Sequence, residues 1–321
     1  MSRAILVGYD PGAADFAPVE LGAELARLTG AQLVVALVHG GVPVLPVGTP
    51  QDHVDYAIGQ VDPDLAPDIV PALENLEPQL RALGVKFEVR PVPSMSAARG
   101  LQAEAERSDA GLLVVGSSRH GRLGSTATRL LHGAPCSVAV APRDWKAGDW
   151  SGDGRPETIG VGYVESDEGR HALESAYALA RHIGARLRVI SVVRETLRMQ
   201  LESEPRYVAG QFGKDTEDVE GEYMLKTEQR VRATVDELGH DVPIEVETLA
   251  GDPAELLADV SRRVDLIVCG SRGYGPLRGV VLGSVTHHLI VEAHCPLIVV
   301  PRGVKRSLEA LLEDVLQADR R

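Results

Sequence analysis

Cysteine is scarce in this chain of 321 residues, which has three: Cys136, Cys269 and Cys295. None of them belongs to a C-x-x-C pair, and this absence argues against a zinc site. Each stands singly on or beside a predicted strand. That position is typical of a small buried hydrophobe in a reducing compartment.

Positive charge is also in deficit, because 33 lysines and arginines face 46 acidic residues and leave a net charge of -13. A protein that binds nucleic acid without regard to sequence needs a basic face to release phosphate counterions. An anionic membrane surface is disfavoured for the same reason. We therefore expect neither nucleic acid nor a membrane among the partners.

Long apolar runs are missing as well, since none approaches the ~20 residues of a membrane-spanning helix. The opening residues, MSRAILVGYD, lead directly into a predicted strand rather than a signal peptide. A cytoplasmic location is therefore expected.

What the chain does contain is a long internal repeat, in which residues 5–143 recur in altered form between 159 and 302. Matching pairs at an offset of 154 include Gly8-Tyr9 with Gly162-Tyr163 and Gly116-Ser117 with Gly270-Ser271. The second copy then carries five extra residues, Arg278 to Leu282, and the offset becomes 159. A period this long exceeds the roughly 20 to 50 residues of solenoid units, so it indicates a duplicated domain.

The repeat predicts the domain organisation. We expect one domain over residues 1–143, a polar, glycine-rich linker over 144–156 and a second domain over 157–302. Residues 303–321 are predicted to form an amphipathic helix, whose apolar face comprises Leu308, Leu311, Leu312, Val315 and Leu316. Because duplication sets a self-complementary surface against its own copy, we expect the domains to be related by a pseudo-two-fold axis.

Each copy alternates short β-branched runs with longer stretches of helical periodicity. In the second copy the runs are 158–163, 187–193, 244–249, 266–269 and 297–300. Near-continuous apolar strands between amphipathic helices predict a parallel sheet covered on both faces, a doubly wound α/β domain. Ligands bind such sheets beyond the carboxyl ends of the strands, where the strand order reverses. Asp252 followed by Pro253 predicts a helix N-terminus.

A glycine-rich loop follows the fourth strand of the second copy. It reads Gly270, Ser271, Arg272, Gly273 and, after nine residues, Gly283 and Ser284, or G-x-x-G-x9-G-S. Glycines let the backbone approach a ligand, and amides at the next helix N-terminus can hold phosphate oxygens. The loop has neither the lysine of a P-loop nor the dinucleotide-binding spacing G-x-G-x-x-G, so we interpret it as an anion-binding loop of another type.

These motifs together resemble the universal stress protein family in its tandem form. The resemblance rests on the glycine loop, the first strand ending at Asp10, the Gly251-Asp252-Pro253 turn and the closing residues 294–301, HCPLIVVP. It covers both copies. It implies a five-stranded parallel sheet in each domain and ATP, with or without Mg²⁺, at the carboxyl edge of the strands.

The resemblance also implies which residues bind ATP. The main-chain adenine contact falls on Val38 and Val192, and the nucleoside carboxylate falls on Asp10. The phosphate loop of the second copy falls on Gly270, Ser271, Arg272, Gly273, Gly283, Ser284 and Val285, and its first-copy counterpart on Gly116, Gly124 and Ser125.

Each copy departs from the family pattern in a different way. The second has Val164 in place of Asp10, with Glu165 as the nearest substitute, whereas the first has Arg119 in place of Gly273 and a loop five residues shorter. Damage to the phosphate-binding loop should lower the affinity for ATP more than the loss of a single hydrogen bond to the nucleoside does. The sequence therefore predicts that the second copy is the better ATP site.

No carboxylate is tied by a motif to a nucleophile or base, so turnover faster than slow ATP hydrolysis is not expected. We expect a regulatory, nucleotide-binding stress-response module that forms a homodimer through sheet edges or the C-terminal helix and acts on an unidentified regulatory protein. Two alternatives stay open: a dimerising interaction protein that needs no nucleotide, and a slow ATP hydrolase or phosphotransferase.

Overall fold

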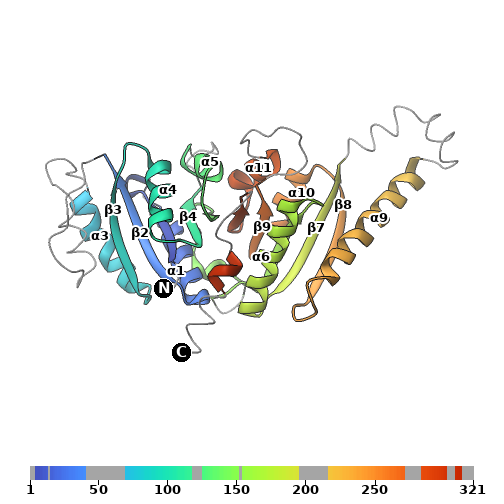
Figure 1. The fold of residues 1–321 in the computed structure, drawn as a ribbon, viewed down its shortest axis with the longest axis horizontal. Helices are drawn as coiled ribbons and strands as arrows, with labels where there is room; N and C mark the ends of the chain where they lie inside the picture. Colours follow the sequence, from blue (N-terminus) through green and yellow to red (C-terminus); the bar gives the residue numbers. More distant parts are fainter. Residues whose placement is uncertain are drawn as a thin grey trace.

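A computed structural model describes residues 4–13, 15–40, 69–117, 125–151, 154–194, 216–271, 283–301 and 308–312. Their ten strands form one sheet in the order β3-β2-β1-β4-β5-β10-β9-β6-β7-β8. The first copy makes one half of this sheet and the second copy the other (Figure 1).

The described elements of the first copy follow the predicted alternation. Its strands are β1 (Ala4–Tyr9), β2 (Gln32–His39), β3 (Phe87–Pro93), β4 (Leu112–Gly116) and β5 (Ser137–Ala141). Its helices are α1 (Ala17–Thr29), α3 (Ile69–Ala82), α4 (Ala97–Arg107) and α5 (Ser125–Leu131), with a short 3-10 turn, η1 (Pro11–Ala13), after β1.

The second copy repeats this order. Its strands are β6 (Thr158–Tyr163), β7 (Arg186–Arg194), β8 (Ile244–Gly251), β9 (Leu266–Gly270) and β10 (Leu297–Val300). Its helices are α6 (Asp167–Ile183), α9 (Thr216–Asp236), α10 (Pro253–Val260) and α11 (Ser284–Glu292). Strand pairing inside each copy is parallel throughout, which confirms the predicted pair of five-stranded parallel sheets.

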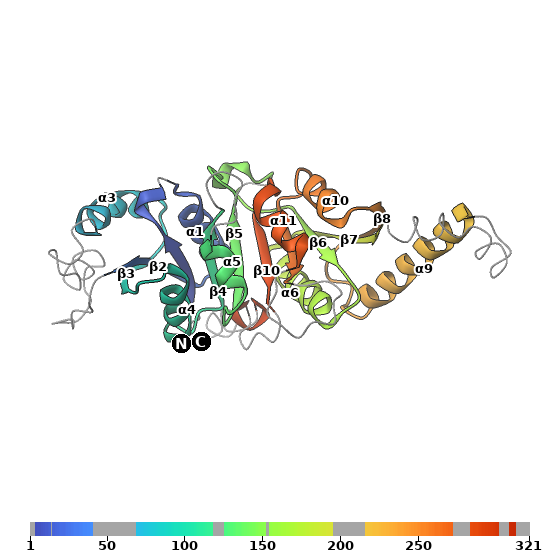
Figure 2. The same cartoon turned by 90° about the horizontal axis from the view of Figure 1, so that it is seen from above.

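The two sheets join where the last strands of the copies meet. β5 and β10 lie side by side at the centre of the molecule and pair antiparallel, with Val138 opposite Val299 and Val140 opposite Leu297 (Figure 2). Antiparallel pairing of equivalent strands is the arrangement a two-fold relation produces. Sequence analysis did not predict that the sheets would fuse into one. The inner edges are thus occupied within the chain, and β3 and β8 form its outer edges.

Helices cover both faces of the sheet (Figure 2). One apolar core lies under α1, α3, α6 and α9, and a second lies under α4, α5, α10 and α11. Helix ends follow the sequence signals. α1 and α6 both end at a glycine with left-handed backbone, Gly30 (φ 71°) and Gly184 (φ 75°), as expected of an αL cap. Asp252 caps α10 by accepting hydrogen bonds from Ala254 N (2.7 Å) and Glu255 N (3.3 Å).

The segment between the copies packs against the domains. Trp145 and Trp150 are each 4% exposed, with ring centroids 5.1 Å apart, and the Trp150 indole donates to Asp265 O at 3.0 Å. The Asp265 carboxylate accepts from the main-chain N–H groups of Ser151, Glu157 and Thr158, each at 2.9 Å. This segment is polar in composition, but its two tryptophans are buried and hold it against the domains.

The start of the C-terminal segment is also buried on the chain itself. Residues 308–312 are helical, and Leu308, Leu311 and Leu312 are at most 3% exposed. Glu309 Oε1 accepts a hydrogen bond of 2.8 Å from Ser175 Oγ of α6. Val315 and Leu316, the rest of the predicted apolar face, lie outside the described residues.

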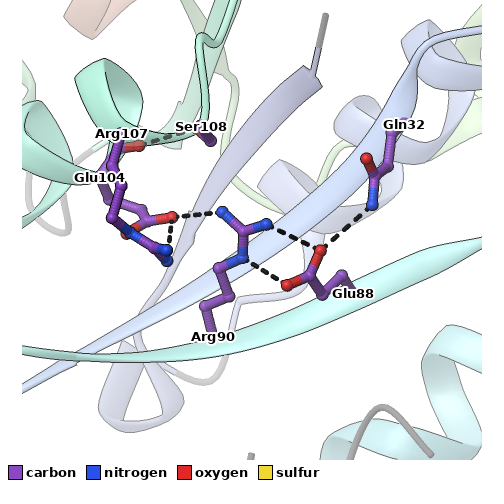
Figure 3. A network of polar contacts seen from close by, with 6 residues as sticks. All are labelled: Gln32, Glu88, Arg90, Glu104, Arg107 and Ser108. Carbon is purple, nitrogen blue, oxygen red and sulfur yellow. Dashed lines mark hydrogen bonds and ion pairs between the residues drawn. The ribbon is translucent and has the colours of Figure 1, made fainter. Parts of the chain in front are cut away.

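A polar network links β2, β3 and α4 near the outer edge of the first copy (Figure 3). The Arg90 guanidinium donates hydrogen bonds to Glu88 (2.5 and 2.8 Å) and to Glu104 Oε1 (2.7 Å). Arg107 Nε donates a further hydrogen bond to Glu104 Oε2 at 2.8 Å. Burial opposes the charged form, but the hydrogen bonds to both glutamates raise the pKa of Arg90. The three cysteines are buried, as predicted, and burial raises the pKa of the Cys269 thiol to about 12.

Candidate functional site

A cavity of about 500 Å³ opens at the carboxyl ends of β1 and β4 in the first copy. These strands are neighbours in the sheet, but β1 leads to β2 on one side while β4 leads to β5 on the other. This is the topological switch point at which doubly wound sheets bind ligands. The volume lies in the range of small-molecule sites, about 300 to 1,000 Å³.

The inner wall of the cavity is apolar. Ala36 and Val38 come from β2, Val115 from β4, and Leu101 from α4. Leu101 approaches the sheet closely because position 8 is glycine: a Cβ there would lie 2.6 Å from Leu101 Cδ1. An apolar slot of this kind suits a flat, weakly polar group such as a base.

The loop after β1 supplies the polar side of the cavity. Asp10 is exposed, and its Oδ1 accepts a hydrogen bond from Gly12 N at 2.9 Å while its carbonyl accepts one from Ala13 N at 3.0 Å. These bonds fold the chain into η1 and hold the Asp10 carboxylate at the rim.

A second carboxylate lies deeper. Asp15 is only 9% exposed, and its Oδ1 accepts a hydrogen bond from the N–H of Ala17, the first residue of α1, at 3.1 Å. Its Oδ2 lies 3.6 Å from the position that a Cβ on Gly116 would occupy. Burial, followed by the charges of Asp10 and Asp15, raises the pKa of Tyr9, whose ring packs edge-on against Phe16.

The structure brings three of the residues predicted for the first copy into this one cavity: Asp10, Val38 and Gly116. Ser125 is the first residue of α5, and the next two residues, Thr126 and Ala127, line the cavity. Gly124 lies outside the described residues. Asp15, Tyr9 and Arg143 were not predicted as lining residues. Their only sequence signal is their position beside the ends of β1 and β5.

In the second copy the two ends of the glycine loop meet. Gly283 N donates to Ser271 O at 3.0 Å, so that Gly270 and Ser271 lie against the start of α11, where Ser284 is exposed and Val285 half-buried. The Thr286 hydroxyl donates to Gly270 O at 3.0 Å. Arg272 and Gly273 lie outside the described residues, and Val192 is half-buried in β7.

The floor of the second copy is more crowded than that of the first. α6 begins at Asp167, and a Cβ on Gly270 would lie 3.0 Å from Glu168 O and 3.1 Å from Glu168 Cβ. At the position equivalent to Asp15 stands Gly169, where any Cβ would lie 1.9 Å from Val164 O. The first turn of α6 therefore covers the strand end that the first copy leaves open.

Glu165, the nearest substitute for Asp10, is held by another residue. Its Oε2 accepts a hydrogen bond from Arg230 Nη1 of α9 at 3.0 Å. The described geometry thus favours the first copy, whereas the ranking from sequence favoured the second. That ranking relied on loop residues 272–282, which lie outside the described residues.

Comparison with known proteins agrees with this architecture. A model of the universal stress protein family matches residues 1–142 and again residues 156–301. The chain belongs to the universal stress protein family. Universal stress protein Rv2005c of Mycobacterium tuberculosis is 30% identical over 222 residues, which cover 68% of this chain and 70% of that protein. Universal stress protein Rv1996 of the same organism is 31% identical over 150 residues, and there the match spans 47% of the relative's length.

Solved structures support the tandem fold of this universal stress protein. A universal stress protein from Archaeoglobus fulgidus matches 94% of this chain and 100% of its own, with a TM-score of 0.61 at 18% identity. The Pseudomonas aeruginosa protein PA1789 matches 99% of this chain and 98% of its own, with a TM-score of 0.55 at 16% identity. At these identities the likeness concerns the fold alone.

Two further observations concern the described parts of the chain. Within them, no three or more His, Cys, Asp or Glu side chains gather in a group that could hold a metal ion. No described helix is both long enough and apolar enough to cross a membrane.

Proposed function

We propose that this universal stress protein binds an adenine nucleotide at the carboxyl edge of its first-copy sheet and acts as a cytoplasmic regulatory module in a stress response. One observation carries the proposal: a single cavity contains Asp10, Val38 and Gly116, three residues that the family resemblance assigns to ATP binding. The apolar slot suits adenine, and Asp10 can accept a hydrogen bond from the sugar.

ATP is the nucleotide that the resemblance implies, with Mg²⁺ as an optional companion of its phosphates. The second copy is the alternative site, because the hydrogen bond from Gly283 N to Ser271 O brings the two ends of its glycine loop together. The same proposal includes a regulatory protein partner and a homodimer, for which the outer strands β3 and β8 are the candidate surfaces, because the described part of the C-terminal segment is buried on the chain itself.

Catalysis is not part of the proposal. The described cavity has two carboxylates and Arg143 but no lysine or histidine among its lining residues, so it offers neither a P-loop-type lysine nor an imidazole base for phosphoryl transfer. Any ATP hydrolysis should therefore be slow, well below ~1 per second.

The direct test is to denature freshly purified protein and identify any nucleotide that is released. Adenine nucleotide at a substantial fraction of one per chain, retained through gel filtration, supports the proposal. Protein that releases no nucleotide and binds none added in titration would instead support an interaction protein that works without nucleotide.

A further inference from the structure

Asp15 is a buried charge for which nucleotide binding, as proposed above, provides no role. It lies at the floor of the first-copy cavity, 9% exposed, and only one of its two oxygens has a hydrogen bond among the described residues, the bond from Ala17 N. That bond orients the carboxylate. Oδ2 then lies on the side of Gly116, 3.6 Å from the Cβ position of that glycine.

Gly116 is the residue at which β4 ends and the first-copy glycine loop begins. By the family resemblance, phosphate groups would be bound by that loop. A carboxylate fixed beneath its first residue repels phosphate, because two like charges a few ångströms apart in a partly buried site interact strongly. The same oxygen is a good acceptor for a neutral hydroxyl.

The charges around Asp15 do not cancel this effect. Tyr9 and Asp10 line the same cavity, and neither brings positive charge. Arg143 is the one cationic side chain among the described lining residues; it is exposed and lies 3.5 Å from the carboxylate of Asp144. The second copy has no counterpart to Asp15, since Gly169 stands there and has no room for a side chain.

We propose that Asp15 is a specificity-determining residue which makes the first-copy cavity prefer a nucleoside, or a nucleotide with few phosphates, over a nucleoside triphosphate. Its Oδ2 accepts a hydrogen bond from a ligand hydroxyl, and its charge keeps phosphate away from Gly116. This inference rests on the proposed function, because it concerns the ligand class of the same site.

The test compares adenosine with ATP on the full-length chain by titration calorimetry, with EDTA and again with Mg²⁺. The variant is Asp15→Asn, which removes the charge but keeps an oxygen that can accept the hydrogen bond from Ala17 N. The matched control is Asp259→Asn on α10, an exposed carboxylate of the other copy whose replacement changes the net charge equally.

We expect the unmodified protein to bind adenosine at least about tenfold more tightly than ATP, and Asp15→Asn to shift the affinity ratio about tenfold toward ATP. Asp259→Asn should leave the ratio unchanged. A ratio that Asp15→Asn does not move would overturn the inference while leaving nucleotide binding intact. ATP binding that needs both Mg²⁺ and Asp15 would overturn it too, since Asp15 would then serve the metal. Binding of neither ligand would defeat the proposed function and the inference together.

Discussion

At the scale of single residues, one buried acceptor group, the Asp265 carboxylate, orders a long segment of the chain. Asp265, just before β9, is 8% exposed and accepts hydrogen bonds from Ser151, Glu157 and Thr158. Through these bonds one side chain fixes the path of the segment between the copies. Nothing in the local sequence marks Asp265, since its partners lie more than a hundred residues earlier.

Replacing Asp265 should therefore be costly. Asp265→Ala leaves three main-chain N–H groups and a hydroxyl without their acceptor, and we expect a loss of about 2 to 4 kcal/mol in the free energy of unfolding. Urea denaturation measures it. Asp259→Ala, at an exposed carboxylate, is the control and should stay within about 0.5 kcal/mol of the parent. A loss for Asp265→Ala no larger than the control's would mean that the segment is held by its tryptophans alone.

His39, at the end of β2, gives the chain a pH-dependent stability. Burial lowers its pKa, so the folded state takes up its proton less readily than the unfolded state. The stabilising contribution is complete above the unfolded pKa of about 6.5 and is lost as pH falls below that value. Between about pH 7.5 and 5.5, the parent should lose more stability than His39→Gln. Equal losses in both, or the same effect from His240→Gln at an exposed site, would contradict this assignment.

At the scale of elements, the C-terminal turn is a structural part of both domains. Leu311 is fully buried, and its side chain fills the space beside Gly111 at the start of β4, where a Cβ would lie 2.9 Å away. Glu309 on the same turn accepts the bond from α6. The turn thus touches the first copy through one residue and the second through another.

Truncating Leu311 should test this. We expect Leu311→Ala to destabilise the chain by about 2 to 4 kcal/mol, because the site is enclosed and cannot collapse around the missing atoms. The same substitution at Leu225 on α9, where the side chain is 55% exposed, should cost less than about 0.5 kcal/mol. Matching melting temperatures for the two variants would show that the turn is dispensable.

Local pattern predicted most of the elements. The strands of the second copy start and end within two residues of the predicted runs, because near-continuous β-branched segments between glycine and proline turns have few alternatives. The predicted cap at Asp252 was equally local. In contrast, the fusion of β5 with β10 and the burial of Trp145 and Trp150 depend on contacts between distant segments, which no window of sequence contains.

The candidate site divides in the same way. Asp10, Val38 and Gly116 were predicted through the family resemblance, and the structure places all three in the lining of one cavity beside the ends of β1, β2 and β4. The choice between the two copies stays a prediction, because the loop residues on which the sequence ranking relied lie outside the described residues. α6 begins four positions earlier than α1 in the repeat register, and its first turn covers Gly270. The comparison of the two copies from sequence was based on their loop residues, and it did not predict the early start of α6.

At the scale of the whole molecule, the chain consists of two copies that share one continuous sheet. The two copies differ at the carboxyl ends of their strands. In the first copy, the carboxyl edge is an open cavity with carboxylates at its rim and floor; in the second, a helix turn lies on the strand end. Duplication leaves each copy free to diverge while β5 and β10 keep them together. The ligand site proposed above therefore lies in the first copy.

The most direct test of this account is the stoichiometry of adenine-nucleotide binding by calorimetry in copy-specific variants. Gly116→Leu fills the first cavity, Gly116→Ala is its control because a Cβ there meets only ordinary contacts, and Gly283→Val alters the second loop at a residue with φ of -64°. We predict about one ligand per chain, affinity reduced at least about 100-fold by Gly116→Leu, and little change in the other two. Binding that survives Gly116→Leu but is abolished by Gly283→Val would contradict the account and return the site to the second copy.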